Sequence, residues 1–150
     1  PLRVGVWGYS SGGAIILEAI GRIRVAAAVS GAPASFGILG LKNLPRGSWE
    51  DKGILYREIP GEVSDEDIDR DKVISIIDQI SCPLFIYHGS DDFLLPMNRW
   101  LFQLIEESGK KIEIRIYEGE NHGSLSCSEI GGKEPLEHIV KFFNKHLKMG

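Results

Sequence analysis

The sequence predicts an α/β fold in which a parallel sheet of about four strands is covered by helices on both faces, a three-layer αβα arrangement. Short apolar runs alternate with segments of helical periodicity along the 150 residues. The first two runs, residues 2–7 and 25–29, are almost entirely apolar and rich in small side chains, as in strands that are buried on both faces. Alternation of this kind favours parallel strands joined by right-handed crossovers.

The first half of the chain contains two expected strands and a long irregular connection. The strand at 2–7 leads into a helix at about 12–20, for which Gly21 is a plausible C-cap. After the second strand, 25–29, we expect a lid-like excursion at about 31–69 within one domain of 150 residues. Its aromatic side chains Trp49 and Tyr56 either line a pocket or pack in the core.

The second half alternates more regularly. Ser64 and Asp67 have the spacing of a capping box, and apolar side chains at helical spacing follow them up to Ile80. A third strand is expected at 83–88, and Pro96 suits the first position of the next helix, which Gly109 closes. A fourth strand at 112–117 has the period of two that is typical nearer a sheet edge, and the last helix begins at about Pro135.

Composition and charge exclude several classes of protein. The chain is 43% apolar and 25% charged, as in ordinary globular domains, and its net charge of −4 without a basic stripe argues against general nucleic-acid binding. No apolar stretch approaches the ~20 residues that span a bilayer, and no signal-peptide pattern is present, so no membrane partner is expected. Cys82 and Cys127 follow no metal or disulfide spacing. We therefore expect free thiols and a cytoplasmic protein.

The most informative segment joins the first strand to the first helix. It reads Gly8-Tyr9-Ser10-Ser11-Gly12-Gly13 and fits the G-x-S-x-G nucleophile elbow, a strained turn that exposes a reactive hydroxyl. Ser10 has glycines two positions before and two positions after it, where a Cβ is expected to clash, whereas Ser11 does not. Ser10 is therefore the predicted nucleophile, and the Ser11 backbone N–H is the predicted oxyanion donor. The competing reading is a glycine-rich turn that only packs tightly.

A serine nucleophile needs a histidine base and an orienting acid, and both candidates follow later strands. His122 lies between glycines just after the fourth strand, whereas His138 and His146 lie in the last helix. The loop after the third strand offers adjacent aspartates, Asp91 and Asp92, which spacing alone does not separate. The two aspartates could also serve only as turn formers before the helix that follows.

With these three segments in the order serine, acid, histidine, the chain resembles the carboxyl-terminal half of an α/β-hydrolase, and most closely the catalytic domain of the prolyl oligopeptidase family. The segment His88-Gly89-x-x-Asp92-x-x-Leu95-Pro96 is similar to that family's H-G-x-x-D-x-x-V-P pattern, with leucine in place of valine. The resemblance implies that Asp92 is the acid. It also implies a serine hydrolase of peptides or carboxylic esters that works through an acyl-enzyme, with no metal or cofactor.

The resemblance also implies that something is missing. A full α/β-hydrolase has about four more strands before the elbow, and a loop among them supplies the second oxyanion donor. We therefore expect an incomplete domain whose first strand needs an upstream segment, another chain or a second copy along its edge. The alternative function is a hydrolase-derived fragment without catalysis that serves binding or assembly.

Overall fold

The computed structural model describes residues 3–41, 63–126 and 133–147. Its described strands form one parallel sheet in the order β1-β2-β3-β4, which is also their order along the chain. The strands are β1 (Gly5–Tyr9), β2 (Ala27–Gly31), β3 (Leu84–Gly89) and β4 (Glu113–Tyr117). The helices are α1 (Ser11–Ala19), α2 (Phe36–Leu39), η3 (Asp65–Asp67), α3 (Arg70–Gln79), α4 (Leu95–Glu107) and α5 (Lys133–Leu147).

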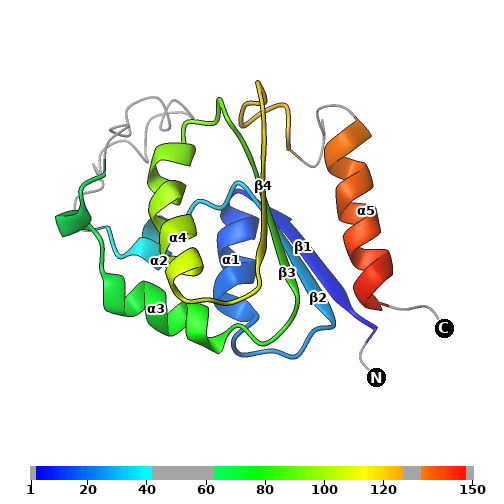
Figure 1. Ribbon diagram of the computed structural model, residues 1–150, viewed down its shortest axis with the longest axis horizontal. Helices are drawn as coiled ribbons and strands as arrows, with labels where there is room; N and C mark the ends of the chain where they lie inside the picture. The colour runs from blue at the N-terminus through cyan, green and yellow to red at the C-terminus, as the bar shows by residue number, and fades with distance from the viewer. Residues whose placement is uncertain (1–2, 42–62, 127–132, 148–150) are drawn as a thin grey trace.

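The sheet separates two hydrophobic layers, as Figure 1 shows, with α5 on one face and α1 to α4 on the other. Alternate residues of the buried strand β3 point into different layers: Leu84 and Ile86 pack among α1 to α4, whereas Phe85 and Tyr87 pack against α5. This confirms the predicted three-layer αβα architecture. The strand β4, predicted to lie nearer an edge, is the last strand of the described sheet and has mostly exposed side chains.

Several predicted boundaries were displaced toward the carboxyl end. The first strand runs at Gly5–Tyr9 rather than 2–7, and the second at Ala27–Gly31 rather than 25–29. Apolar residues before each strand extended the predicted runs, but backbone pairing starts later, where Gly5 lies beside Ala27. The Ser64–Asp67 capping box is present, yet it caps the short helix η3, and α3 begins only after Asp69, whose carboxylate accepts from the Lys72 N–H.

The predicted excursion lies between β2 and α3. Its described beginning contains the short helix α2, which is buried, and its described end contains η3. Trp49, Tyr56 and residues 42–62 as a whole lie outside the described residues, so the predicted lid stays a prediction. Among the described helices, none has the length and apolar character that crossing a membrane requires.

Candidate active site

Ser10 lies between the last residue of β1 and the first residue of α1, on a turn with an unusual backbone. Its φ of 57° and ψ of −116° are rare for a residue with a side chain. Backbone hydrogen bonds hold this conformation: the Ser10 N–H donates to the Gly31 carbonyl, and the Ser10 carbonyl accepts from the N–H groups of Ala14 and Ala34. The elbow is thus fixed by α1 and by the segment after β2, which is the geometry that a strained strand-to-helix serine requires.

The structure requires glycine at position 8 but not at position 12. This corrects the expectation that a Cβ would clash at both positions. A Cβ on Gly8 would lie 2.5 Å from the Gly12 carbonyl oxygen, so only glycine fits there. A Cβ on Gly12 would meet no neighbouring atom within 4 Å. A Cβ on Gly13 would lie 2.8 Å from the Gly31 carbonyl oxygen, so Gly13 allows α1 to approach β2.

The structure brings Ser10, His122 and Asp92 together in one hydrogen-bonded chain. Nε2 of His122 lies 3.0 Å from Oγ of Ser10, and Nδ1 of His122 lies 2.7 Å from Oδ2 of Asp92. The Asp92 side chain is completely buried, whereas the His122 side chain is 22% exposed. The other carboxylate oxygen of Asp92 accepts from the Leu94 N–H at 2.8 Å. Asp91, the alternative acid, instead accepts a hydrogen bond from the hydroxyl of its neighbour Ser90.

The loops that carry Asp92 and His122 are bound to each other. The Ser90 N–H donates to the Tyr117 carbonyl, and the Asp91 N–H donates to the Glu120 carbonyl at 3.0 Å. The Ser90 hydroxyl in turn accepts from the Gly119 N–H. Gly89 makes this approach possible, because a Cβ there would overlap the backbone of Glu120. The glycine of the His88-Gly89 pair therefore sets the distance between the two loops.

Two aromatic rings flank His122, and neither was singled out from the sequence. The ring centroids of Tyr9 and Phe93 lie 5.1 Å and 4.9 Å from that of His122. The Tyr9 hydroxyl also donates to the His122 backbone carbonyl at 2.6 Å. Both residues directly adjoin predicted site residues, Ser10 and Asp92, so adjacency in the motif was the signal that could have found them.

A second, fully buried histidine lies behind the acid and was missed as part of the site. Nδ1 of His88 lies 3.8 Å from Oδ2 of Asp92 and 3.1 Å from the Gly89 carbonyl oxygen. Its Nε2 lies 2.8 Å from the amide nitrogen of Asn98, which also donates to the Pro33 carbonyl. Burial lowers the pKa of His88, an effect that the nearby Asp92 carboxylate partly opposes. The arrangement holds His88 as a neutral imidazole beside Asp92.

The remaining predicted groups lie as follows. Ser11 is the first residue of α1, and no acceptor is found for its backbone N–H among the described residues, as is usual in the first turn of a helix. Cys82 is a free thiol whose pKa is raised by burial, whereas Cys127 lies outside the described residues. Within the described ranges there is no group of three or more His, Cys, Asp or Glu side chains that could hold a metal ion.

Comparison with known proteins now places the chain. The sequence model of the prolyl oligopeptidase family matches residues 1–150. The chain belongs to the prolyl oligopeptidase family. No curated protein matches it. The segment that resembles the H-G-x-x-D-x-x-V-P pattern of this family contains Asp92, whose carboxylate lies within hydrogen-bonding distance of His122.

Solved structures agree on the fold of this prolyl oligopeptidase family member. An acylaminoacyl peptidase of Pyrococcus horikoshii has a TM-score of 0.64 at 18% identity, over 99% of this chain and 25% of its own. A puromycin-hydrolyzing peptidase of Mycobacterium tuberculosis has a TM-score of 0.63 at 18% identity, over 97% of this chain and 22% of its own. An esterase of Pyrococcus furiosus has a TM-score of 0.59 at 16% identity, over 97% of this chain and 55% of its own.

The chain therefore spans about a quarter of the length of the first of these relatives. The likeness to these structures shows an α/β-hydrolase fold, and the family match shows the family to which the chain belongs.

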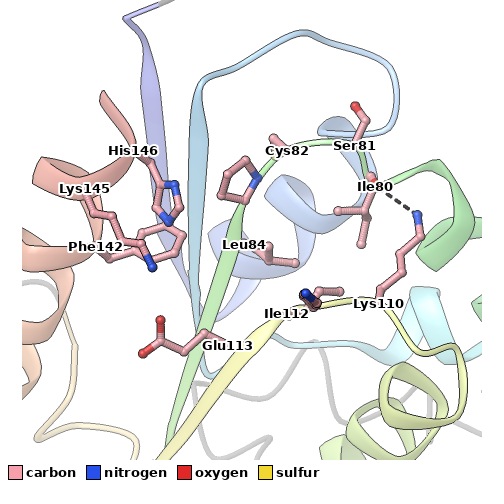
Figure 2. Close-up of a pocket in the computed structure, with 12 residues that line it drawn as sticks. Ile80, Ser81, Cys82, Leu84, Lys110, Ile112, Glu113, Phe142, Lys145 and His146 are labelled. Atoms are coloured by element: carbon pink, nitrogen blue, oxygen red, sulfur yellow. Dashed lines mark hydrogen bonds between the residues drawn. The ribbon is translucent and has the colours of Figure 1, made fainter. Parts of the chain in front are cut away.

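Two hollows of the described surface lie away from Ser10, Asp92 and His122. Figure 2 shows one of about 630 Å³ at the amino ends of β3 and β4, between Leu84, Glu113 and the end of α5 at His146. In a parallel α/β sheet, ligands bind beyond the carboxyl ends of the strands, which is where Ser10, Asp92 and His122 lie. The hollow at the amino ends is therefore not the candidate site.

Proposed function

We propose that the chain is the catalytic portion of a serine hydrolase that cleaves peptide or carboxylic ester bonds through an acyl-enzyme. The observation that carries the proposal is the continuous chain of hydrogen bonds from Ser10 Oγ through His122 to the buried carboxylate of Asp92. Family membership and the peptidase and esterase neighbours support the same chemistry.

In the first step Ser10 Oγ attacks the carbonyl carbon of the substrate, and its proton passes to Nε2 of His122. The carbonyl π electrons move to oxygen, and the Ser11 N–H stabilises the resulting oxyanion as one of the donors. When the tetrahedral intermediate collapses, the carbon–nitrogen or carbon–oxygen bond breaks. The amine or alcohol then leaves with the proton from His122. Water, deprotonated by His122, repeats the sequence on the acyl-enzyme and releases a carboxylic acid and free Ser10.

Asp92 is suited to orienting His122 because its carboxylate is buried. Its Oδ2 accepts from Nδ1–H of His122, which leaves Nε2 of the neutral ring free to take the Ser10 proton. When His122 becomes an imidazolium, the carboxylate lies 2.7 Å away and compensates the new charge. The Leu94 N–H holds the other oxygen, so the carboxylate keeps one orientation throughout.

The experiment that tests the proposal is hydrolysis of p-nitrophenyl esters and of peptide p-nitroanilides by the full-length gene product. Ser10→Ala is compared with Ser11→Ala, which removes a hydroxyl from the adjacent residue and leaves its backbone N–H in place. We expect Ser10→Ala to lose activity by about 10⁴-fold or more and Ser11→Ala to retain most of it. Equal activity of wild type and Ser10→Ala would contradict the proposal. Complete inactivity of a folded wild type would favour the binding or assembly alternative.

A further inference from the structure

The outer edge of β4 presents unpaired backbone groups in a defined pattern. Among the described residues β4 pairs only with β3. The Tyr117 carbonyl accepts from the Ser90 N–H, so the backbone groups of Tyr117 point toward β3. Because successive residues of a strand direct these groups to opposite sides, Arg115 and Glu113 also point toward β3. The N–H and C=O groups of Ile114 and Ile116 consequently point away from the sheet.

The sequence of this edge has the same pattern of apolar and charged residues in both directions, but the charges are opposite in sign. Residues 112–116 read Ile-Glu-Ile-Arg-Ile, with opposite charges on either side of Ile114. In an antiparallel pair centred on Ile114, each Glu113 lies opposite the partner's Arg115, and each Ile112 lies opposite the partner's Ile116. Ile114 would form the hydrogen-bonded pair with its own copy, as its outward N–H and C=O require. The charged residues then occupy non-hydrogen-bonded positions, where facing side chains are closest.

A groove of about 810 Å³ lies beside this edge. Its walls include Ile114 and Ile116 of β4, Arg99, Phe102, Gln103 and Glu106 of α4, and Lys110 beyond that helix. The ammonium group of Lys110 donates to the carbonyls of Asp78 and Ile80. Helix α4 and strand β4 run in opposite directions, as Figure 1 shows. Arg99 is in the first half of α4 and Glu106 is near its end, so by chain direction Arg99 is on the side of the carboxyl end of β4 and Glu106 on the side of its amino end. A two-fold axis through Ile114 therefore brings Arg99 toward the partner's Glu106. Both side chains are exposed and form no ion pair within the described residues.

We propose that the edge of β4 and the adjoining groove of α4 are a two-fold interface with a second copy of this chain. Two pairs of opposite charges that the two-fold operation brings together, and the outward backbone groups of Ile114, carry the proposal. Glu113 and Arg115 form an exposed ion pair within one copy, which the pairing would exchange for contacts across the axis. The groove and Ile116, which is 42% exposed, supply surface that pairing would bury. The resulting sheet is continuous across both copies, and the contact is isologous and closed.

The charges also select one register. A shift that centres the pair on Glu113 or on Arg115 places like charges opposite each other, which is destabilising. Parallel pairing in register aligns Glu113 with Glu113 and is excluded for the same reason. A shift of a single residue moves every side chain to the opposite face. Of these arrangements, the one centred on Ile114 satisfies backbone, charge and apolar groups together.

The test is a charge-exchange cycle in the full-length gene product, followed by sedimentation velocity over a range of concentrations. We expect wild type to dimerise and each single variant, Glu113→Arg or Arg115→Glu, to weaken the dimer by about tenfold, because two like-charge contacts replace two ion pairs. The double variant, Glu113→Arg with Arg115→Glu, restores opposite charges across the axis and should recover the wild-type dissociation constant.

Thermal unfolding of each variant is the control. The melting temperature should change little, because the exposed ion pair between Glu113 and Arg115 within one copy contributes little to stability. A second cycle with Arg99→Glu and Glu106→Arg should behave in the same way. A monomeric wild type would overturn the proposal. So would a dimer that the single variants leave intact, or failure of the double variant to recover. These results would mean that another partner, or none, covers the edge. Labelling of Ser10 is a separate readout, so this proposal and the proposed function fail independently.

Discussion

The amide nitrogen of Asn98 lies 2.8 Å from Nε2 of His88 and fixes the tautomer of that buried ring. The same nitrogen donates to the Pro33 carbonyl at 2.9 Å, so the amide cannot be turned without placing two oxygens in contact. Nε2 of His88 is therefore an acceptor, and the ring proton lies on Nδ1, toward Gly89 and Asp92. Protonation of Nε2 would bring two donors face to face.

His88 should make stability depend on pH below neutrality. Burial lowers the pKa of folded His88, so the unfolded chain, with a His pKa of ~6.5, binds the proton first. The contribution is fully present above pH ~6.5 and is lost as pH falls from there toward the lower pKa of folded His88. In urea unfolding at several pH values, His88→Gln should flatten this part of the profile. His138→Gln, on α5, serves as the control. An unchanged slope in His88→Gln would contradict this account.

Asn98→Ala should destabilise the fold. The change leaves Nε2 of His88 buried without its donor, which typically costs about 1–3 kcal/mol. It also removes one hydrogen bond to the Pro33 carbonyl, which keeps those from the Ser35 N–H and hydroxyl. Chemical unfolding at neutral pH measures the change. Gln103→Ala, on the exposed side of the same helix, is the matched control and should shift the free energy of unfolding by less than ~1 kcal/mol. Equal effects of the two substitutions would show that the buried network contributes nothing particular.

Asp92→Asn should reduce turnover by about 10⁴-fold while the fold persists. The asparagine oxygen can still accept from the Leu94 N–H, but its NH₂ group then faces Nδ1 of His122 and favours the wrong tautomer. Asp91→Asn, one residue earlier and exposed, should stay within a few-fold of wild type in kcat. If Asp91→Asn were the inactive variant, the assignment of the acid would be reversed.

Gly8→Ala and Gly12→Ala should differ sharply, although both lie two residues from Ser10. The Cβ of Gly8→Ala meets the Gly12 carbonyl, so the elbow must open, and both the melting temperature and ester hydrolysis should fall. The Cβ of Gly12→Ala meets open space in the first turn of α1, so stability should hold or rise by up to ~1 kcal/mol. Thermal unfolding and the hydrolysis rate report both effects. Comparable damage from the two substitutions would contradict the elbow geometry.

Tyr9→Phe should lower kcat/KM modestly, by about three- to tenfold, without unfolding the protein. The substitution keeps the ring beside His122 but removes the hydroxyl that donates to the His122 carbonyl, a contact worth about 0.5–1.5 kcal/mol. Tyr117→Phe is the control, because its hydroxyl contacts His138 on α5 instead. A Tyr9→Phe enzyme as active as wild type would mean that this hydrogen bond does not help to position His122.

The sequence predicted the architecture because the strands of this sheet are short, buried and separated by helical periodicity. The order of the chemistry-bearing loops followed from the topology alone, and the resemblance to the family selected Asp92 over Asp91. Strand ends were displaced because the apolar runs before Gly5 and Ala27 extend beyond the backbone pairing. Nothing in the sequence pattern indicates which side chain lies behind Asp92, since His88 and Asn98 meet across β3 and α4 only when the layers pack. The open space at Gly12 depends on the direction of one Cα–Cβ bond, which a motif does not specify.

The most direct test of the account is to map the site at which a fluorophosphonate reacts. Attack by a serine oxygen on phosphorus releases fluoride and leaves one stable adduct that peptide mass spectrometry can locate. We predict a single adduct on Ser10, reduced by at least about 10³-fold in rate in His122→Ala, because the proton acceptor 3.0 Å from Oγ is then absent. An adduct on Ser11 or on another residue, or labelling of Ser10 at the same rate without His122, would contradict the proposed mechanism.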